Sequence, residues 1–133
     1  MIESGTATPP DQPGVIVLVP GSAHRSGPLK LIPRPDHLEA LPDPWRLASP
    51  AVARELLYPL LGVDESDASY YADPPEALQA GAGHADGVVA LMSTVSEKAI
   101  DAATTAGLRF PQKSTFFVPK PRSGLVIRSF EDG

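Results

Sequence analysis

The strongest candidate for chemistry is a basic segment near the end of the chain. Residues 109–128 carry five basic side chains and no acidic one. Within them, an ammonium group is followed by two hydroxyl groups and then by two more basic groups: Lys113, Ser114, Thr115, Lys120 and Arg122. Such groups, with nearby backbone N–H groups, can hold a phosphate or a carboxylate. The segment therefore predicts a binding site for a small anion.

The same residues also fit a structural role. Ser114 and Thr115 can cap the beginning of a strand, with Lys113 in solvent or beside an acidic neighbour. The glycines that let a P-loop backbone wrap around a phosphate are missing. The sequence alone leaves both interpretations open.

Other polar and aromatic stretches carry weaker signals. His24 and Arg25 lie in a Gly-, Ser- and Pro-rich segment, typical of an exposed hairpin loop. The acidic run 64–67 lacks the spacing of a calcium loop and indicates a solvated turn. Tyr70 and Tyr71 can stack on a base, but neighbours on a strand point to opposite sides, so we expect one of them in the core. The three histidines show no metal-ligand spacing, and we predict neither a metal nor a cofactor.

Composition limits the class of protein. The chain has no cysteine, which excludes disulfides and fits a reducing compartment. No apolar stretch approaches the roughly 20 residues of a membrane-spanning helix, and residues 1–14 do not resemble a signal peptide. The net charge of −5 argues against nucleic-acid binding by the whole surface. We therefore expect a cytoplasmic protein that binds neither a membrane nor nucleic acid.

The pattern of residues predicts one α+β domain over residues 15–131, with a mixed α/β arrangement left open. Residues 1–14 are rich in proline and small polar residues and indicate a disordered lead-in. We expect five or six strands and three helices. The expected strands are 15–19, 29–32, 69–72, 87–92, 115–118 and 125–128, of which 87–92 has the continuous apolar run of a strand buried on both faces.

Local capping signals place the three helices. Ser49-Pro50 predicts a serine cap with proline at the first helical position, and Pro59 should kink or end that helix before Gly62 closes it. Asp73 and two prolines open a short helix that Gly81 ends. Thr94 and Glu97 fit a capping box for a helix that runs to about Ala106, with Gly107 as its C-terminal stop. Residues 33–50, rich in proline, indicate an extended connector.

The last third of the chain resembles a known family. The run of residues 110–120, Phe-Pro-Gln-Lys-Ser-Thr-Phe-Phe-Val-Pro-Lys, followed by Ser-Gly-Leu-Val at 123–126, is similar to the end of the domain-of-unknown-function family 1015 (DUF1015). The leucine-rich stretch 56–63 resembles the family's proline-leucine-leucine-glycine helix. The upstream Asp-Gly-His-His-Arg segment of full-length family members has no counterpart here, and Gln112 stands where the family often has proline.

Two functions follow as hypotheses. Without that upstream segment, the resemblance implies a non-catalytic interaction domain that binds a protein partner or a second copy of itself. The alternative is an anion-binding domain built around Lys113, which could be part of an enzyme completed by a partner chain. The sequence leaves enzymatic activity open.

Overall fold

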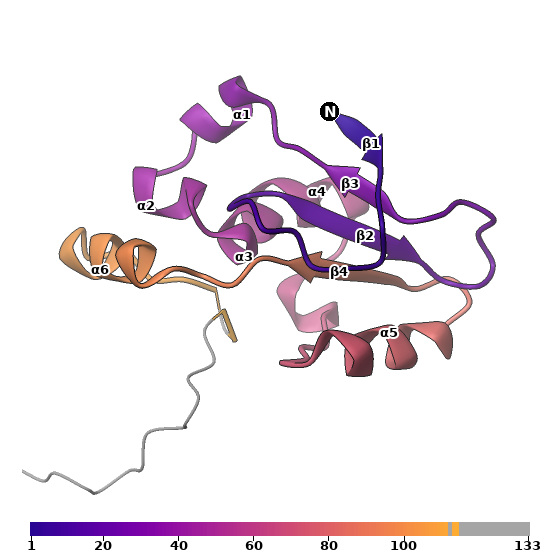
Figure 1. Ribbon diagram of the computed structural model, residues 1–133. Coiled ribbons are helices and arrows are strands. Elements are labelled where there is room, and N and C mark those ends of the chain that lie inside the picture. Colours follow the sequence, from indigo (N-terminus) through magenta and orange to yellow (C-terminus); the bar gives the residue numbers. More distant parts are fainter. Residues whose placement is uncertain (112, 115–133) are drawn as a thin grey trace, which may run out of the picture.

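The computed structural model describes residues 1–111, 113 and 114. Its four strands form one antiparallel sheet in the order β1-β3-β2-β4 (Figure 1). The strands are β1 (Ile2–Ser4), β2 (Ile16–Pro20), β3 (Leu29–Leu31) and β4 (Val88–Met92). The pairing of β2 with β3 confirms the two strands predicted before residue 33. The two strands predicted at 115–118 and 125–128 lie outside the described residues.

The first strand differs from the expected lead-in. The sequence predicts disorder over residues 1–14, but residues 2–4 pair with β3. The Met1 ammonium donates to the Ile32 carbonyl over 2.8 Å, and the Gly5 N–H donates to the Pro28 carbonyl over 2.9 Å. Backbone groups supply this pairing, and every side chain of β1 is exposed. Composition therefore gave no signal for it.

The position of β4 corrects two predictions. β4 pairs with β2 alone among the described strands, so it lies at one end of the sheet, and only Leu91 of its five residues is buried. The strand expected at 69–72 is a loop. The β-propensity of Tyr70 and Tyr71 is not sufficient to make this segment a strand, because no described strand pairs with it.

The helix predicted from Ser49 forms in three continuous parts. α3 (Ser49–Val52) leads into the π-helical η1 (Ala53–Leu57) and then α4 (Tyr58–Leu61). The Tyr58 N–H donates to the Ala53 carbonyl, five residues back. The expected kink at Pro59 thus takes the form of a π-turn before the proline, which cannot donate a hydrogen bond. Gly62 ends the helix in the left-handed conformation, with φ +65°, as predicted.

Two other predicted helices are present. α5 (Pro74–Ala82) follows Asp73 as expected. α6 (Glu97–Thr105) begins later than its predicted capping box, because the cap is Ser96, whose hydroxyl accepts from the Ala99 N–H over 3.2 Å. Thr94 plays no part in it.

Two short helices were missed in the proline-rich connector. These are α1 (Pro35–Glu39) and α2 (Asp43–Arg46), and each has proline in its first two positions. Proline is compatible with helix there, since the N–H it lacks has no helical acceptor. With residues 49–61 counted as one helix and the short 3-10 helix Glu65–Asp67 left aside, the described residues contain four strands and five helices, where the sequence predicted five or six strands and three helices. The α+β class is confirmed.

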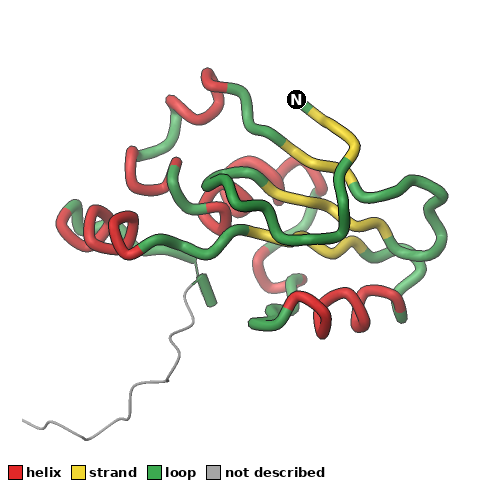
Figure 2. The backbone as a smooth tube through the Cα atoms, in the orientation of Figure 1, coloured by secondary structure: helices red, strands yellow, loops and turns green. Residues whose placement is uncertain are grey.

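In Figures 1 and 2, α3 and α4 lie behind the sheet and α5 lies beside β4. On one face, Ile16 and Leu18 of β2 pack against Leu57 and other buried residues of the helical layer: Leu41, Val52 and Ala53. On the opposite face α5 lies so close to β4 that a Cβ atom at Gly81 would overlap the Val89 side chain. No helix in this described part is long and apolar enough to cross a membrane.

Candidate binding groove

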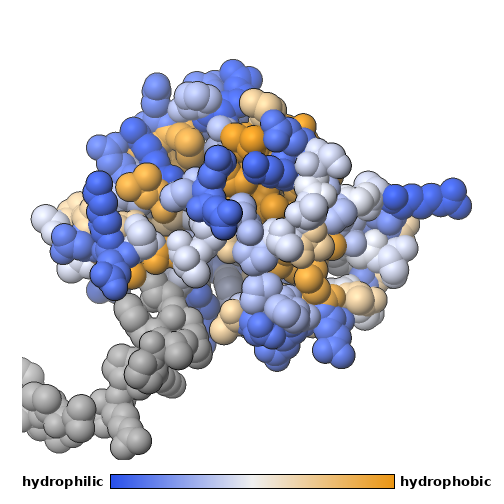
Figure 3. All heavy atoms as spheres, in the orientation of Figure 1, coloured by the Kyte–Doolittle hydropathy of each residue, from blue (hydrophilic) through white to orange (hydrophobic). Residues whose placement is uncertain are grey.

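An open groove of about 1160 Å³ runs beside β4. We call it the β4 groove. Its apolar walls come from β4, the end of α4, the loop before α5, and the chain around α6: Leu61, Val63, Tyr70, Tyr71, Val88, Met92, Ile100 and Pro111. Figure 3 shows the surface hollowed in the area where Figure 1 places β4, α5 and the chain after α6. The volume exceeds the roughly 300–1,000 Å³ of a small-molecule pocket.

Exposed apolar side chains gather at this groove. Of the nine large hydrophobic residues that are exposed in the described part of the chain, five line it: Leu61, Val63, Tyr70, Tyr71 and Val88. Tyr70 is 41% exposed and Tyr71 45%, so the expectation that one of them lies in the core is wrong. Both stand on a loop, where the alternation of a strand does not apply. Such a gathering of exposed apolar groups is typical of a binding surface.

The outer edge of β4 presents backbone groups to the groove. The ladder between β2 and β4 continues beyond the end of both strands. There the Gly21 N–H donates to the Gly87 carbonyl over 2.8 Å, and the Ala23 N–H donates to the Ala85 carbonyl over 3.0 Å. Alternate residues bond across an antiparallel pair. In the register of β2 and β4, the residues that bond β2 are therefore Val89 and Leu91. The N–H and carbonyl groups that point away from β2 are those of Val88, Ala90 and Met92, and no described strand pairs with them.

One buried hydroxyl fixes the end of β4. The sequence predicts Ser49 as a helix cap, but the cap is Ala48 and Ser49 is fully buried. Its Oγ accepts from the Gly14 N–H over 3.0 Å, donates to the Val15 carbonyl over 3.1 Å, and lies 2.9 Å from Ser93 Oγ. Because Ser49 has one hydroxyl proton, Ser93 is the donor of that third bond. Ser93 follows β4 and lines the groove.

Tyr58 stands in the groove wall as a neutral hydrogen-bonding group. Burial raises the pKa of Tyr58 well above its usual value, with a hydrogen bond to Tyr70 and the charges of Tyr70 and Glu65 adding to the effect. All of these factors favour the protonated phenol. Tyr58 is therefore suited to binding and positioning, and not to acting as a base at neutral pH.

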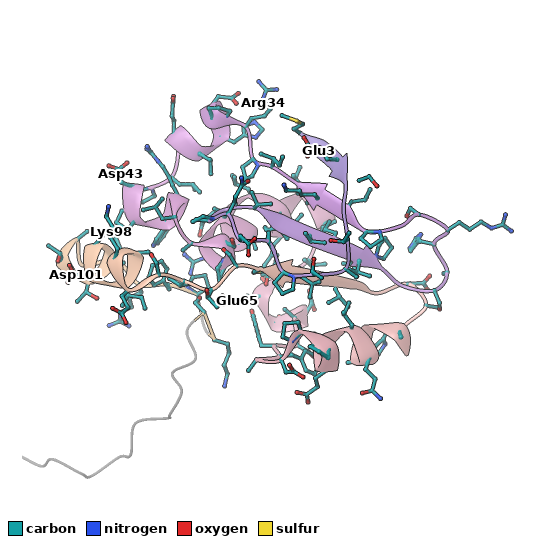
Figure 4. The ribbon with its side chains drawn as sticks, in the orientation of Figure 1. Glu3, Arg34, Asp43, Glu65, Lys98 and Asp101 are labelled. Carbon is teal, nitrogen blue, oxygen red and sulfur yellow. The ribbon has the colours of Figure 1, made fainter. Side chains whose placement is uncertain are left out.

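Carboxylates outnumber cations at the groove. Asp67, Asp86 and Glu97 line it, against Lys113 as the one lysine or arginine among its described residues. The Asp67 carboxylate accepts from the Asp64 N–H over 2.8 Å, and none of the three forms a salt bridge to a described residue. In Figure 4, the labelled charges Lys98 and Asp101 lie on α6, away from the middle of β4.

Two of the five predicted anion-binding residues belong to the same groove. Lys113 and Ser114 line it, while Thr115, Lys120 and Arg122 lie outside the described residues. The Ser114 hydroxyl donates to the Pro111 carbonyl over 2.5 Å, and Lys113 has a left-handed φ of +59°. Because the Ser114 proton is already used, that hydroxyl cannot also donate to an anion. The described residues offer no group of three or more His, Cys, Asp or Glu side chains that could hold a metal ion.

Sequence reasoning missed the groove itself. Its signal is the apolar run at 87–92, which the sequence alone predicts as a strand buried on both faces. An apolar strand at the end of a sheet has one unpaired edge, and such an edge is typical of a strand that pairs with a further segment.

Comparisons with known proteins identify no relative. No protein-family model matches the chain, and neither a curated protein nor a solved structure matches it. These comparisons lend no support to the resemblance to DUF1015, which stays a prediction from the sequence.

Proposed function

We propose that this chain is a non-catalytic interaction domain that binds an extended segment of a protein chain in the β4 groove. The observation that supports it most is the coincidence of exposed apolar side chains with the outward edge of β4. The groove is so large and open that a small ligand would leave most of its walls in contact with water. A polypeptide segment can fill it and satisfy the edge.

Local features fit this role. Natural edge strands are usually short or carry charges that prevent pairing. β1, at the other end of the sheet, has three residues and includes Glu3, whereas β4 has five residues and no charge. The unprotected edge is thus the one that faces the groove.

Affinity capture from the cells that make this chain tests the proposal, with Leu61→Ser and Leu60→Ser as a matched pair. Both leucines are exposed on α4, at 44% and 82%, but only Leu61 lines the groove. We expect the wild type and Leu60→Ser to retain the same partner and Leu61→Ser to bind it roughly tenfold more weakly. The purified partner should reproduce that difference by calorimetry.

A chain that captures no protein and is monomeric by light scattering would count against an interaction domain. Equal loss of the partner in both variants would mean that binding uses the tip of α4 and not the groove.

A second candidate is the anion-binding function, with possible completion of an enzyme by a partner chain. One observation favours it: Lys113 lines the groove, as do the hydroxyl-bearing residues Ser93 and Thr94. A thermal-shift screen of phosphorylated metabolites and carboxylates at low salt tests it. A ligand at 100 times its Kd should add about 2.7 kcal/mol of stability, and Lys113→Ala should abolish that gain. A ligand that stabilises both proteins equally binds elsewhere.

A further inference from the structure

The two ends of β4 carry the same charge. Asp86 comes two residues before the strand, Glu97 comes five residues after it, and both line the groove. Both side chains belong to exposed residues without a salt bridge to any described residue. Asp67 adds a third carboxylate from the loop before α5. A segment laid along β4 therefore meets negative charge near each of its ends.

Between these ends the edge is apolar and able to form hydrogen bonds. The outward N–H and carbonyl groups of Val88, Ala90 and Met92 repeat at the spacing of an antiparallel or parallel ladder. β4 has five residues, which span roughly 16 Å at the rise of a strand. Val88 is 46% exposed, and Met92 lines the same groove.

From these two observations we infer that the occupant is an extended segment of another protein that adds to the sheet as a strand beside β4. Its central residues, about five, are apolar or β-branched, and a lysine or arginine stands near each end. The backbone ladder supplies affinity, and the carboxylates at the two ends select the basic segment over an acidic one. The inference rests on the proposed function and names the chemistry of its partner.

The experiment uses the full chain and a capped probe peptide, Lys-Val-Thr-Val-Thr-Val-Lys, with its glutamate counterpart, Glu-Val-Thr-Val-Thr-Val-Glu. Amide hydrogen exchange is followed by NMR. At saturation the lysine peptide should slow exchange at Val88, Ala90 and Met92. It should bind about tenfold more tightly than the glutamate peptide at low salt, and the preference should shrink as salt screens the charges. Replacing both carboxylates, with Asp86→Asn and Glu97→Gln, should remove the preference.

A pair of edge prolines separates strand addition from simple apolar binding. In Ala90→Pro the lost N–H points away from β2, so the sheet should survive while the new ladder is interrupted. Ser4→Pro is the matched control on the opposite edge. The Gly5 N–H donates to the Pro28 carbonyl and the Ile32 N–H donates to the Met1 carbonyl, so residues 1 and 5 bond the chain of β3. Because alternate residues bond across an antiparallel pair, the Ser4 N–H points outward at that edge. We expect Ala90→Pro to bind the lysine peptide at least tenfold more weakly and Ser4→Pro to bind it as the wild type does. If Ala90→Pro does not fold, the exchange measurement on the wild type decides.

Several outcomes would overturn the inference. Slow exchange at the three amides in a monomer without peptide would mean that this chain's own residues 115–133 cover the edge. Slow exchange in a dimer would identify a second copy as the occupant. Equal binding of both peptides would refute selection by charge. Unchanged exchange with every peptide would refute strand addition, and the Leu61→Ser comparison would still decide the proposed function by itself.

Discussion

Ser49 shows how one side chain can join three segments of the chain. Its hydroxyl binds Gly14 and Val15 just before β2 and also Ser93 just after β4. Because the residue is fully buried, water cannot replace these partners. Loss of a hydroxyl there leaves a buried N–H and a buried carbonyl without a hydrogen bond.

Ser49→Ala should therefore destabilise the fold. Each orphaned backbone group costs about 1–3 kcal/mol, and partial relaxation should leave a total loss of about 2–3 kcal/mol. Chemical denaturation followed by circular dichroism measures it. Ser93→Ala is the control, since Ser93 is only partly buried and its loss leaves the two backbone groups bonded. We expect that variant to lose less than about 1 kcal/mol. Equal losses would show that the Ser49–Ser93 bond, and not the backbone groups, is the important contact.

At the scale of elements, the contact between α5 and β4 sets one wall of the groove. Gly81 makes this approach possible because a larger residue would overlap Val89. α5 in turn positions Ala77 and Gly81 at the groove. The close contact of this helix with β4 thus helps to form one side of the groove.

Gly81→Ala should destabilise the protein although alanine favours helix. Helix propensity gains about 1 kcal/mol, but forcing a methyl group into a filled contact costs about 1–3 kcal/mol. We expect a net loss of about 1 kcal/mol in denaturant unfolding. Gly83→Ala is the matched control, because Gly83 has a φ of −77° and its added Cβ would lie 3.4 Å from the nearest atom, an ordinary contact.

That control should be neutral or slightly stabilising. The Val89→Ala substitution should relieve the penalty in the double variant, because it removes the overlapping methyl groups. A Gly81→Ala protein as stable as Gly83→Ala would mean that α5 does not press on β4.

At the scale of the whole molecule, Tyr58 links the global free energy of unfolding to alkaline pH. Its pKa is raised in the folded state by burial and by the hydrogen bond to Tyr70, from a usual value of 10.0. Between the unfolded and folded pKa values, the unfolded chain has lost the Tyr58 proton and the folded chain has kept it. The stabilisation is therefore complete below pH 10 and is lost as pH rises above it.

The free energy of unfolding should thus fall above pH 10 more steeply in the wild type than in Tyr58→Phe. A difference of one bound proton changes the free energy of unfolding by at most about 1.4 kcal/mol per pH unit. Because Tyr58 is partly exposed, we expect a smaller slope. Urea denaturation at a series of pH values gives the comparison. Parallel curves for wild type and Tyr58→Phe would exclude this linkage.

Several elements could be predicted from the sequence because their signals are local. Proline and the residue before it mark the beginning of α3 and α5, and Gly62 marks the end of α4. The β-branched run at 15–19 and the turn residues after it predict β2 and its antiparallel neighbour. The same local rules misplaced the beginning of α6, where Ser96 competes with Thr94 as the cap.

The candidate site was only partly predictable. The side-chain chemistry of Lys113 and Ser114 indicates a binding role, and both residues line the groove. Leu61, Val63 and Val88 give no such signal, because an apolar residue on a helix or a strand is usually part of a core. Only their positions in the folded chain show that they are exposed together.

The sequence by itself determined the α+β class, the helices with strong terminal signals and the central hairpin, since each depends on neighbours within a few residues. Tertiary structure alone decided that residues 2–4 join the sheet, that β4 pairs with β2 on one side, and that an acidic, apolar groove follows its other side. These features depend on backbone pairing between distant segments. An apolar run looks the same in the sequence whether its strand ends up with two neighbours or with one.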